Sequence, residues 1–562
     1  MLGLHWLDWL AVGAYFALTT WIGLRAARAV SGSSDYFMGG RRFGRAYMVA
    51  HALGTGTSTE QPVTVAGATY QLGLAGIWYQ WLYLFATPFY WLLAPVYRRL
   101  RYMTMGDFFE RRYGSAMGAA YTGLGLFNFI VSIALMLKGT ALTIDAISGG
   151  AMPFTAVVFA LTALFVLYSY AGGLTAAITS DLLQGVLIIG LSILLLPFAI
   201  DAVGGWTAVQ QKVPDAMWSF IAPQEVTLFF VVMVVLNALV GVVVEPHHMA
   251  VCGAAKSELA SRTGWTYGNF IKRFLTLAWA VTGILAAVLY PGLENRELAF
   301  GTLVTNLLPA GLIGVMIACM AAAVISTCDA FMVGAGALYT RNLHMRYVSP
   351  GADDATQLRV GRWSSLAVVA LGVALALLLP SLISGLKLLW TSAAAFGIAF
   401  WGAVLFRRAN RYGMAASLAV TLGLIVGTGP FGLEWPLPTQ IAVYLPAGFA
   451  TLVIVSLLTR PEPEAATHAF YTLLATPVGD EAALKAQGIE VIDAGDASAA
   501  DTAGAVSRGV PQGLIAVGAL SLHERFSFAR YRVDLLGFLA AAALVAGILG
   551  LALLVAWLGR GG

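Results

Sequence analysis

Glycines, hydroxyl side chains, a carboxylate and a proline are concentrated between residues 54 and 62, near the middle of an apolar run. Two glycines and a proline make a poor continuous helix, so this pattern predicts an interruption that leaves backbone carbonyl groups unpaired. Inside a bilayer, unpaired carbonyls are tolerated only where they line a cavity within the protein. Glu60 and Gln61 are therefore candidates for contact with a polar solute.

A second polar cluster, Glu245-Pro246-His247-His248, lies well inside a later apolar run. Ionisable side chains are costly in a membrane and usually line a bundle interior or a solute path. Pro246 also removes one helical hydrogen bond, which predicts a second break. Glu245, His247 and His248 thus join the candidate solute contacts. A simpler interpretation of either cluster alone is a proline kink with polar residues that pack helices together.

A third polar cluster, the run from Ala321 to Asp329, contains small residues and hydroxyl side chains. Either Ser326 or Thr327 alone could simply bond back to its own helix. Together with carbonyl groups from a broken helix, however, the neighbouring hydroxyls would form a shell of hard oxygen ligands without a carboxylate. Such a shell suits a monovalent cation better than calcium or magnesium.

The elements that position these residues are predicted to be membrane-spanning helices. Hydrophobic residues make up 59% of the 562 residues and charged residues only 11%, against about 25% charged in an ordinary soluble domain. We expect an all-α polytopic membrane protein with about 14 spans, because its apolar runs reach the length of about 20 residues that crosses a bilayer. The runs cover approximately residues 6–28, 46–73, 76–99, 117–150, 152–170, 174–203, 226–252, 268–291, 308–339, 358–381, 383–406, 411–432, 437–459 and 532–558.

Basic residues gather in the loops that follow the odd-numbered spans, for example Arg41 and Arg42, or Lys272 and Arg273. Cytoplasmic loops carry an excess of arginine and lysine. We therefore expect the N-terminus outside, residues 460–530 in the cytoplasm and the C-terminus outside. The expected location is the bacterial cytoplasmic (inner) membrane, with the lipid bilayer as the surrounding partner.

The segment 460–530 is polar and rich in Ala, Gly, Glu and Asp. Ala469 to Leu474 could form a short helix, and Ala482 to Ile492 a strand. A small regulatory domain with a cytoplasmic partner and a partly ordered linker are both compatible with this composition.

The two predicted breaks fall in the second and the seventh span, five spans apart. Because five is odd, a second unit of five helices would be inverted relative to the first. Interrupted helices at matching places in two inverted halves indicate the binding site of a secondary transporter.

Four stretches of the chain resemble the sodium:solute symporter family. They are Asp35–Arg41, Thr104–Gly114, Gly172–Asp181 with Gln184, and Ala321–Asp329. The resemblance covers roughly residues 1–460 and implies a leucine-transporter-like fold, with inverted five-helix repeats and two broken helices. The corresponding parts are 1–45 (first helix and loop), 46–203 and 226–407 (the two repeats), 408–459 (two additional helices), 460–530 (the polar segment) and 531–562 (the last helix).

The resemblance also implies a sodium site between the first and the eighth helices of the repeats. Its carbonyl ligands would be Gly54, Thr57 and Ala323, and its hydroxyl ligands Ser326 and Thr327. Asp181 matches an acidic residue that is linked in the family to sodium release toward the cytoplasm. The alternative role for Asp181 is to cap the start of its helix.

Departures from the family's sugar carriers leave the solute open. Glu60-Gln61 resembles the sugar-carrier form, but Gln80 stands where those carriers have a glutamate, and Glu245 begins a stretch that differs from their Asn-Gln start. Tyr83, in the same span as Gln80, completes the candidate solute contacts. Asp329 and Ala330 stand where some relatives need hydroxyls for a second sodium site, which leaves the stoichiometry open.

Together these residues predict a sodium-coupled symporter that takes up a small polar solute of the sugar, amino acid or carboxylate type. Sodium would be carried rather than held as a catalytic cofactor, and neither enzymatic activity nor a nucleic acid partner is expected. One alternative is a proton-coupled carrier of the same fold, with Glu60, Glu245, His247 or His248 as the relay. Another is a transporter-like sensor that signals through residues 460–530.

Overall fold

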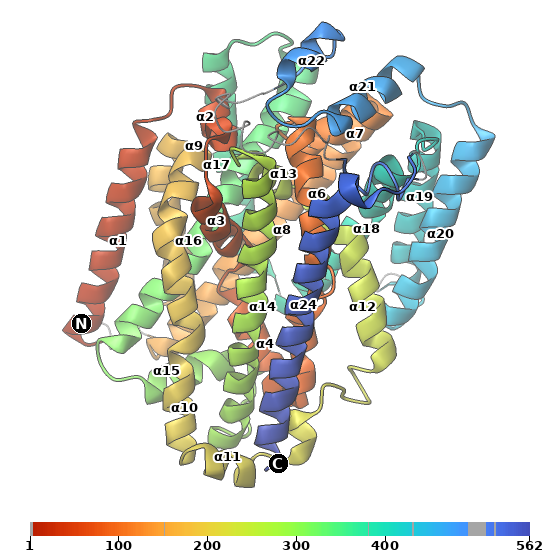
Figure 1. Cartoon of the computed structure of the whole chain (residues 1–562). Coiled ribbons are helices and arrows are strands. Elements are labelled where there is room, and N and C mark those ends of the chain that lie inside the picture. The colour runs from red at the N-terminus through yellow and green to blue at the C-terminus, as the bar shows by residue number, and fades with distance from the viewer. Residues whose placement is uncertain are drawn as a thin grey trace.

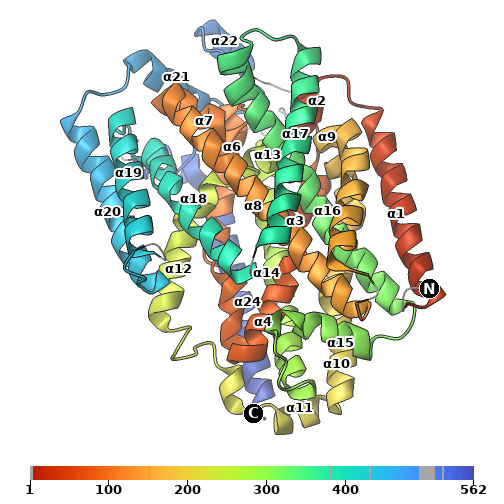
Figure 2. The ribbon, with the colours of Figure 1, turned by 180° about the vertical axis from the view of Figure 1, so that it is seen from behind.

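The computed structural model describes residues 4–150, 152–379, 382–429, 432–492, 513–521 and 524–561. In these residues the regular structure is helical, and β-pairing is limited to two isolated bridges, Phe43 with Ala255 and Ala222 with Val226. Nine described helices are long and apolar enough to cross a membrane. Shorter apolar helices such as Phe154–Leu167, Leu228–Val244 and Thr391–Leu405 accompany them. The helices pack side by side in one elongated bundle (Figures 1 and 2).

Both predicted helix breaks are confirmed. The first separates α3 (Arg45–Gly56) from α4 (Glu60–Leu72), and Thr57 between them has extended backbone. The second separates α12 (Leu228–Gly241) and the short turn η4 (Val242–Val244) from α13 (His248–Gly253). Glycine and proline therefore interrupt helices here as their local conformational preferences require.

The third predicted span is also divided, and an irregular residue separates the fifth from the sixth. The third consists of α5 (Trp78–Trp81) and α6 (Thr87–Leu100). In α9 (Phe154–Ile193) the backbone leaves the helical region at Gly173, which has a φ of 53°. That change falls between the predicted runs 152–170 and 174–203, and α10 (Leu195–Val203) follows.

Helices α14 (Glu258–Leu289) and α16 (Leu312–Tyr339) each pack against several other helices. Helix α14 packs on α3, α4 and α6, whereas α16 packs on α8 (Ser115–Ile147), α9 and α17 (Asp354–Leu378). Gly264 and Gly268 let α14 approach α3 closely: added Cβ atoms would lie 2.5 Å from the Met48 side chain and 2.7 Å from the Val49 carbonyl oxygen. Small residues at such spacing are typical of tightly packed membrane helices.

The other helices surround this core. They are α1 (Trp6–Ala27), α2 (Ser33–Met38), α7 (Met105–Tyr113), α11 (Trp206–Lys212), α15 (Ala299–Leu307), α18 (Leu382–Leu405), α19 (Arg411–Thr428), α20 (Leu437–Leu458), α21 (Glu464–Ala475), α22 (Glu481–Ala486) and α24 (Phe528–Gly559). Helices α2, α7, α21 and α22 lie at one end of the bundle, and α10, α11 and the C-terminus lie at the other (Figures 1 and 2).

Two predictions from the sequence are wrong. Residues 482–492 form no strand, because Glu481–Ala486 is helical and turns follow it, with no neighbouring strand among the described residues. The expected short helix is present as part of α21. Lys272 and Arg273 are not loop residues, since both are buried inside α14. They lie within the predicted run 268–291, so the sequence contained the signal that places them in a span.

Candidate sodium and solute site

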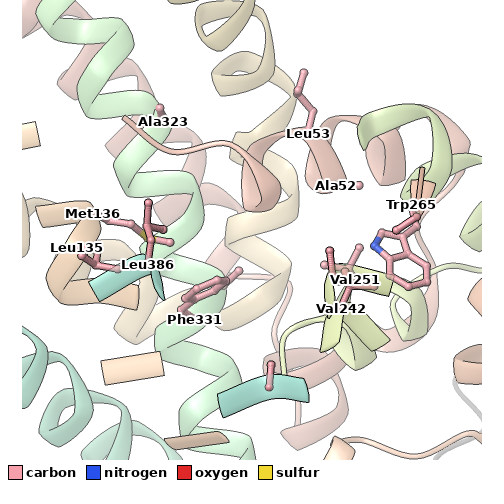
Figure 3. Close-up of a cluster of buried hydrophobic side chains, with 14 of the residues drawn as sticks. Ala52, Leu53, Leu135, Met136, Val242, Val251, Trp265, Ala323, Phe331 and Leu386 are labelled. Carbon is pink, nitrogen blue, oxygen red and sulfur yellow. The ribbon is translucent and has the colours of Figure 1, made fainter. Parts of the chain in front are cut away.

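Apolar side chains surround the two helix breaks. In Figure 3, Leu53 of α3, Val242 and Val251 beside the second break, and Phe331 of α16 lie around the same interior region, with Trp265 of α14 at its edge. All five side chains are at most 5% exposed. Polar groups among them are therefore removed from bulk water, and each needs a partner within the protein.

The end of α3 meets α16 through one hydroxyl group. Thr327 Oγ1 lies 3.0 Å from the carbonyl oxygen of Gly54 and 3.2 Å from that of Ala323, one turn earlier in α16. The Gly54 carbonyl also accepts the N–H of Thr57, at 3.1 Å. Three of the predicted sodium ligands, Gly54, Ala323 and Thr327, are thus brought together across 273 residues of chain.

The other two predicted sodium ligands, Ser326 and Thr57, are sequence neighbours of this group. Ser326 is completely buried, and its hydroxyl donates to Oδ1 of Asp181 at 2.5 Å. Thr57 is also completely buried, and its Oγ1 has no hydrogen-bond partner among the described residues. The carboxyl end of a helix carries a partial negative charge, so the end of α3 adds to the attraction for a cation.

A side chain at position 54 would not fit. A Cβ atom there would lie 2.2 Å from Ser326 Oγ and 3.2 Å from Asp181 Oδ1. Glycine is required because α3, α9 and α16 come together at this point. Hydroxyl and carbonyl oxygens are ligands of the kind that suit a hard cation.

Asp181 does not cap the start of a helix, which corrects one of the two roles considered for it. It lies inside α9, well beyond the irregular Gly173, and bonds to side chains of two other helices. One of these partners is His51 of α3, whose Nδ1 lies 2.6 Å from Asp181 Oδ2. His51 was missed from the sequence, because a lone histidine in an apolar run gives no sign of a partner 130 residues away.

Glu60 and Gln61 lie at the start of α4, directly after the break. Glu60 accepts a hydrogen bond from Ser58 and is 4% exposed. Gln61 Nε2 donates to the Gly56 carbonyl at 3.1 Å, and the ammonium group of Lys272 donates to the same oxygen. Lys272 therefore places a cationic group at the broken segment, a contact that no sequence pattern predicts.

Gln80 and Tyr83 flank Arg273, the neighbour of Lys272 on α14. Arg273 Nη1 donates to the backbone carbonyl of Gln80 at 3.2 Å. The Arg273 guanidinium also lies over the Tyr83 ring, 5.4 Å from its centre. These two candidate solute residues are thus joined to the helix that packs on the first break.

The second break is supported by side chains that bind its freed carbonyl groups. His248 Nδ1 lies 2.8 Å from the Val242 carbonyl oxygen. Tyr97 and Tyr121 donate to the carbonyls of Val243 and Val244, both at 2.6 Å. Each buried carbonyl of this turn consequently has a donor, as the energetics of buried polar groups demand.

His247 turns toward α16. Its ring stacks on Phe331 with 4.8 Å between centroids, and it contacts the His248 ring at 4.2 Å. Its Nδ1 is buried and has no hydrogen-bond partner among the described residues. Glu245, just before the proline, is only partly buried. His247 and Glu245 therefore retain polar groups that a solute could bind.

Two broken helices with buried polar groups, inside a bundle of membrane-spanning length, define a secondary membrane transporter. Residues 36–421, more than half of the chain, match the family model described as "Sodium:solute symporter family". The protein belongs to this family, whose members transport solutes together with sodium.

Characterised relatives are transporters rather than enzymes. The chain is 25% identical to a sodium/pantothenate symporter of Haemophilus influenzae, over 71% of this chain and 85% of the relative. It is also 25% identical to a sodium/glucose cotransporter of Vibrio parahaemolyticus, covering 66% and 74%. The osmoregulated proline transporter OpuE of Bacillus subtilis is 25% identical over 82% of this chain and 96% of its own length.

Solved structures share the fold. A Na⁺-coupled sialic acid symporter in a substrate-bound outward-open state superposes with a TM-score of 0.72, at 16% identity, covering 81% of this chain and 98% of that one. Mhp1, a nucleobase-cation-symport-1 family transporter, superposes with a TM-score of 0.53 at 11% identity, covering 78% and 98%. The expected transporter fold is therefore confirmed at the level of overall architecture.

Proposed function

We propose that this protein couples the inward movement of sodium to the uptake of a small polar solute by alternating access. The observation that carries the proposal is the Thr327 hydroxyl, which joins the Gly54 carbonyl at the first helix break to the Ala323 carbonyl of α16. Sodium at this place would be bound by Gly54, Thr57, Ala323, Ser326 and Thr327. Asp181 would assist its release.

The solute site would include residues on the other side of the first break and residues of the second break. Its contacts would come from Glu60, Gln61, Gln80, Tyr83, Glu245, His247 and His248. Sodium would draw together the end of α3 and α16, and this would order the start of α4, where Glu60 and Gln61 lie. Ion and solute then favour the same conformation, so each raises the affinity for the other.

The proposed architecture has about 14 spans, since each of the pairs α3/α4, α5/α6 and α12/α13 counts as one crossing and α9 counts as two, one on each side of Gly173. Residues 46–203 and 226–407 would form the two inverted repeats, followed by the additional helices in 408–459 and 531–562. The end that carries α2, α7, α21 and α22 would face the cytoplasm, with both termini outside. Arg41 and Arg42 near α2 support this orientation.

The test begins with identification of the solute. Purified protein is screened against sugars, amino acids and carboxylates for a rise in melting temperature, with and without sodium, because a ligand of the native state raises apparent stability. Proteoliposomes are then assayed for uptake of the identified solute. Uptake should require an inward sodium gradient. Equal uptake in a proton gradient without sodium would instead establish the proton-coupled alternative.

A further inference from the structure

A chain of three buried side chains links α3 to α16 through α9. His51 Nδ1 lies 2.6 Å from Asp181 Oδ2, and Ser326 Oγ lies 2.5 Å from Asp181 Oδ1. All three residues are completely buried. The chain ends beside the Gly54 backbone, whose Cβ position is 2.2 Å from Ser326 Oγ.

The direction of each hydrogen bond follows from the groups involved. When Asp181 is ionised, its carboxylate only accepts, so in that state His51 supplies the hydrogen from Nδ1 and Ser326 supplies the hydrogen of its hydroxyl. A serine hydroxyl that donates its hydrogen to a fixed acceptor retains both oxygen lone pairs. Asp181 therefore leaves the lone pairs of Ser326 Oγ available for a cation.

We propose that His51 is a positioning residue for sodium binding: it holds the Asp181 carboxylate in the orientation that accepts the Ser326 hydrogen. This inference rests on the proposed sodium site and adds to it a side chain whose hydrogen-bond partners among the described residues, Asp181 and Thr55, are not proposed ligands. Without a donor at position 51, Asp181 Oδ2 would lose its bond from α3. The carboxylate could then turn away from Ser326, and the hydroxyl would lose its fixed acceptor.

The geometry also identifies which half of the imidazole matters. The bond to Asp181 is made by Nδ1, and Thr55 Oγ1 lies 3.2 Å from the same nitrogen. The other ring nitrogen, Nε2, has no hydrogen-bond partner among the described residues. An asparagine places its amide nitrogen near the position of Nδ1 in histidine, so it can replace the functional half of the ring.

The experiment compares His51→Leu with His51→Asn, which are similar in size but differ in the ability to donate. Sodium affinity is measured without any solute, as the rise in melting temperature with increasing sodium at constant ionic strength. Leucine should raise the half-saturating sodium concentration about tenfold, the effect of losing about 1.4 kcal/mol. Asparagine should keep it within about threefold of the original protein.

A double-mutant cycle tests whether His51 acts through Asp181. In an Asp181→Asn background, His51→Leu should change the half-saturating sodium concentration by less than about twofold, because the carboxylate to be positioned is gone. Independent effects that multiply would overturn the proposal. So would equal losses in His51→Leu and His51→Asn, which would indicate that the ring only fills space.

Melting temperatures in the absence of sodium control for folding. If His51→Leu does not fold, His51→Gln replaces it, because glutamine donates from the position of Nε2 and cannot reproduce the Nδ1 bond. Unchanged sodium dependence in whichever of these variants folds refutes the role of His51 alone. Absence of any sodium effect in the original protein refutes the proposed sodium site instead, so the two failures are distinguishable.

Discussion

A single hydroxyl group, that of Thr327, joins two helices at the end of α3. It lies within hydrogen-bond distance of carbonyls that belong to Gly54 and Ala323. A hydroxyl can donate to one carbonyl and still present its lone pairs to an ion, which a methyl group cannot do. The identity of the side chain at 327 therefore matters more than its shape.

Thr327→Ala and Thr327→Val should both raise the half-saturating sodium concentration about tenfold, and Thr327→Ser should leave it nearly unchanged. The half-saturating sodium concentration is measured first from the melting temperature at increasing sodium, and then from the rate of solute uptake at increasing sodium. Valine has nearly the shape of threonine but lacks the hydroxyl. If Thr327→Ala weakened sodium binding and Thr327→Val did not, Thr327 would serve packing alone. The same pair of measurements on Ser326→Ala should give a loss of similar size.

Gly54→Ala should abolish sodium-dependent stabilisation at concentrations that saturate the original protein. Its Cβ would lie 2.2 Å from Ser326 Oγ, so the hydroxyl or the helix end must move. Gly123→Ala in α8 is the matched control, since nothing lies within 4 Å of a Cβ there. Combining Gly54→Ala with Ser326→Ala removes the 2.2 Å contact and leaves the 3.2 Å contact with Asp181 Oδ1, so it should restore part of any lost folding stability but not sodium binding.

At the scale of elements, the break between α12 and α13 is held by tyrosine hydroxyls from two other helices. Tyr97 belongs to α6 and Tyr121 to α8, and each donates to one carbonyl of η4. Tertiary contacts thus stabilise an interruption that Pro246 favours locally. Glu245, His247 and His248 therefore lie in a segment that is bonded both to α6, which packs on α14, and to α8, which packs on α16.

Tyr121→Phe should destabilise the protein by about 1–3 kcal/mol, because the Val244 carbonyl would stay buried without a donor. Thermal unfolding in detergent measures the loss, with the exposed Tyr412→Phe as control. The half-saturating sodium concentration should remain that of the original protein, since Tyr121 is not part of the first break. A large change in sodium affinity with unchanged stability would contradict this structural role.

At the scale of the whole molecule, the segment that follows α20 is docked onto the transporter. Arg101, at the end of α6, bonds to Glu481 at 2.8 Å and to the Pro477 carbonyl at 2.7 Å. Glu258 at the start of α14 accepts the N–H of Val478 at 3.1 Å. Residues 464–492 therefore belong to the folded unit, and deleting 460–530 would deprive the buried Arg101 of these partners.

Glu481→Gln should loosen α22 at neutral pH, seen as faster hydrogen exchange of residues 477–487, whereas Glu464→Gln on exposed α21 surface should not. Burial alone would raise the pKa of Glu481, but the N–H of Gly479 and the Arg101 guanidinium hold that pKa below its usual range. Because the pKa of Glu481 is lowered in the folded protein, the ion pair of Glu481 with Arg101 stabilises the docked α22 fully at pH values above the ordinary carboxyl pKa of about 4.3. This stabilisation is lost as the pH falls through the lowered pKa of Glu481. Unaltered exchange in Glu481→Gln would contradict this.

Much of the architecture could be predicted from the sequence, because its causes are local. Apolar runs long enough for a bilayer predict helices, and the glycines and prolines near residues 54–62 and Pro246 predict where two of them break. The family resemblance added the expected fold. The strand at 482–492 failed because a short apolar alternation does not decide between helix and strand.

Which polar side chains meet depends on contacts between helices that lie far apart in the sequence. His51, Asp181 and Ser326 lie on three helices, and their hydrogen bonds span 130 and 145 residues. Lys272 lies within a predicted span, but only the packing of α14 against α3 shows that its ammonium group reaches the Gly56 carbonyl. Because water is absent from the membrane interior, the long apolar runs already predict that the polar groups within them need partners in the protein. The choice among partners depends on helix rotation and close approach, which glycines such as Gly54 and Gly268 permit but which no local pattern encodes.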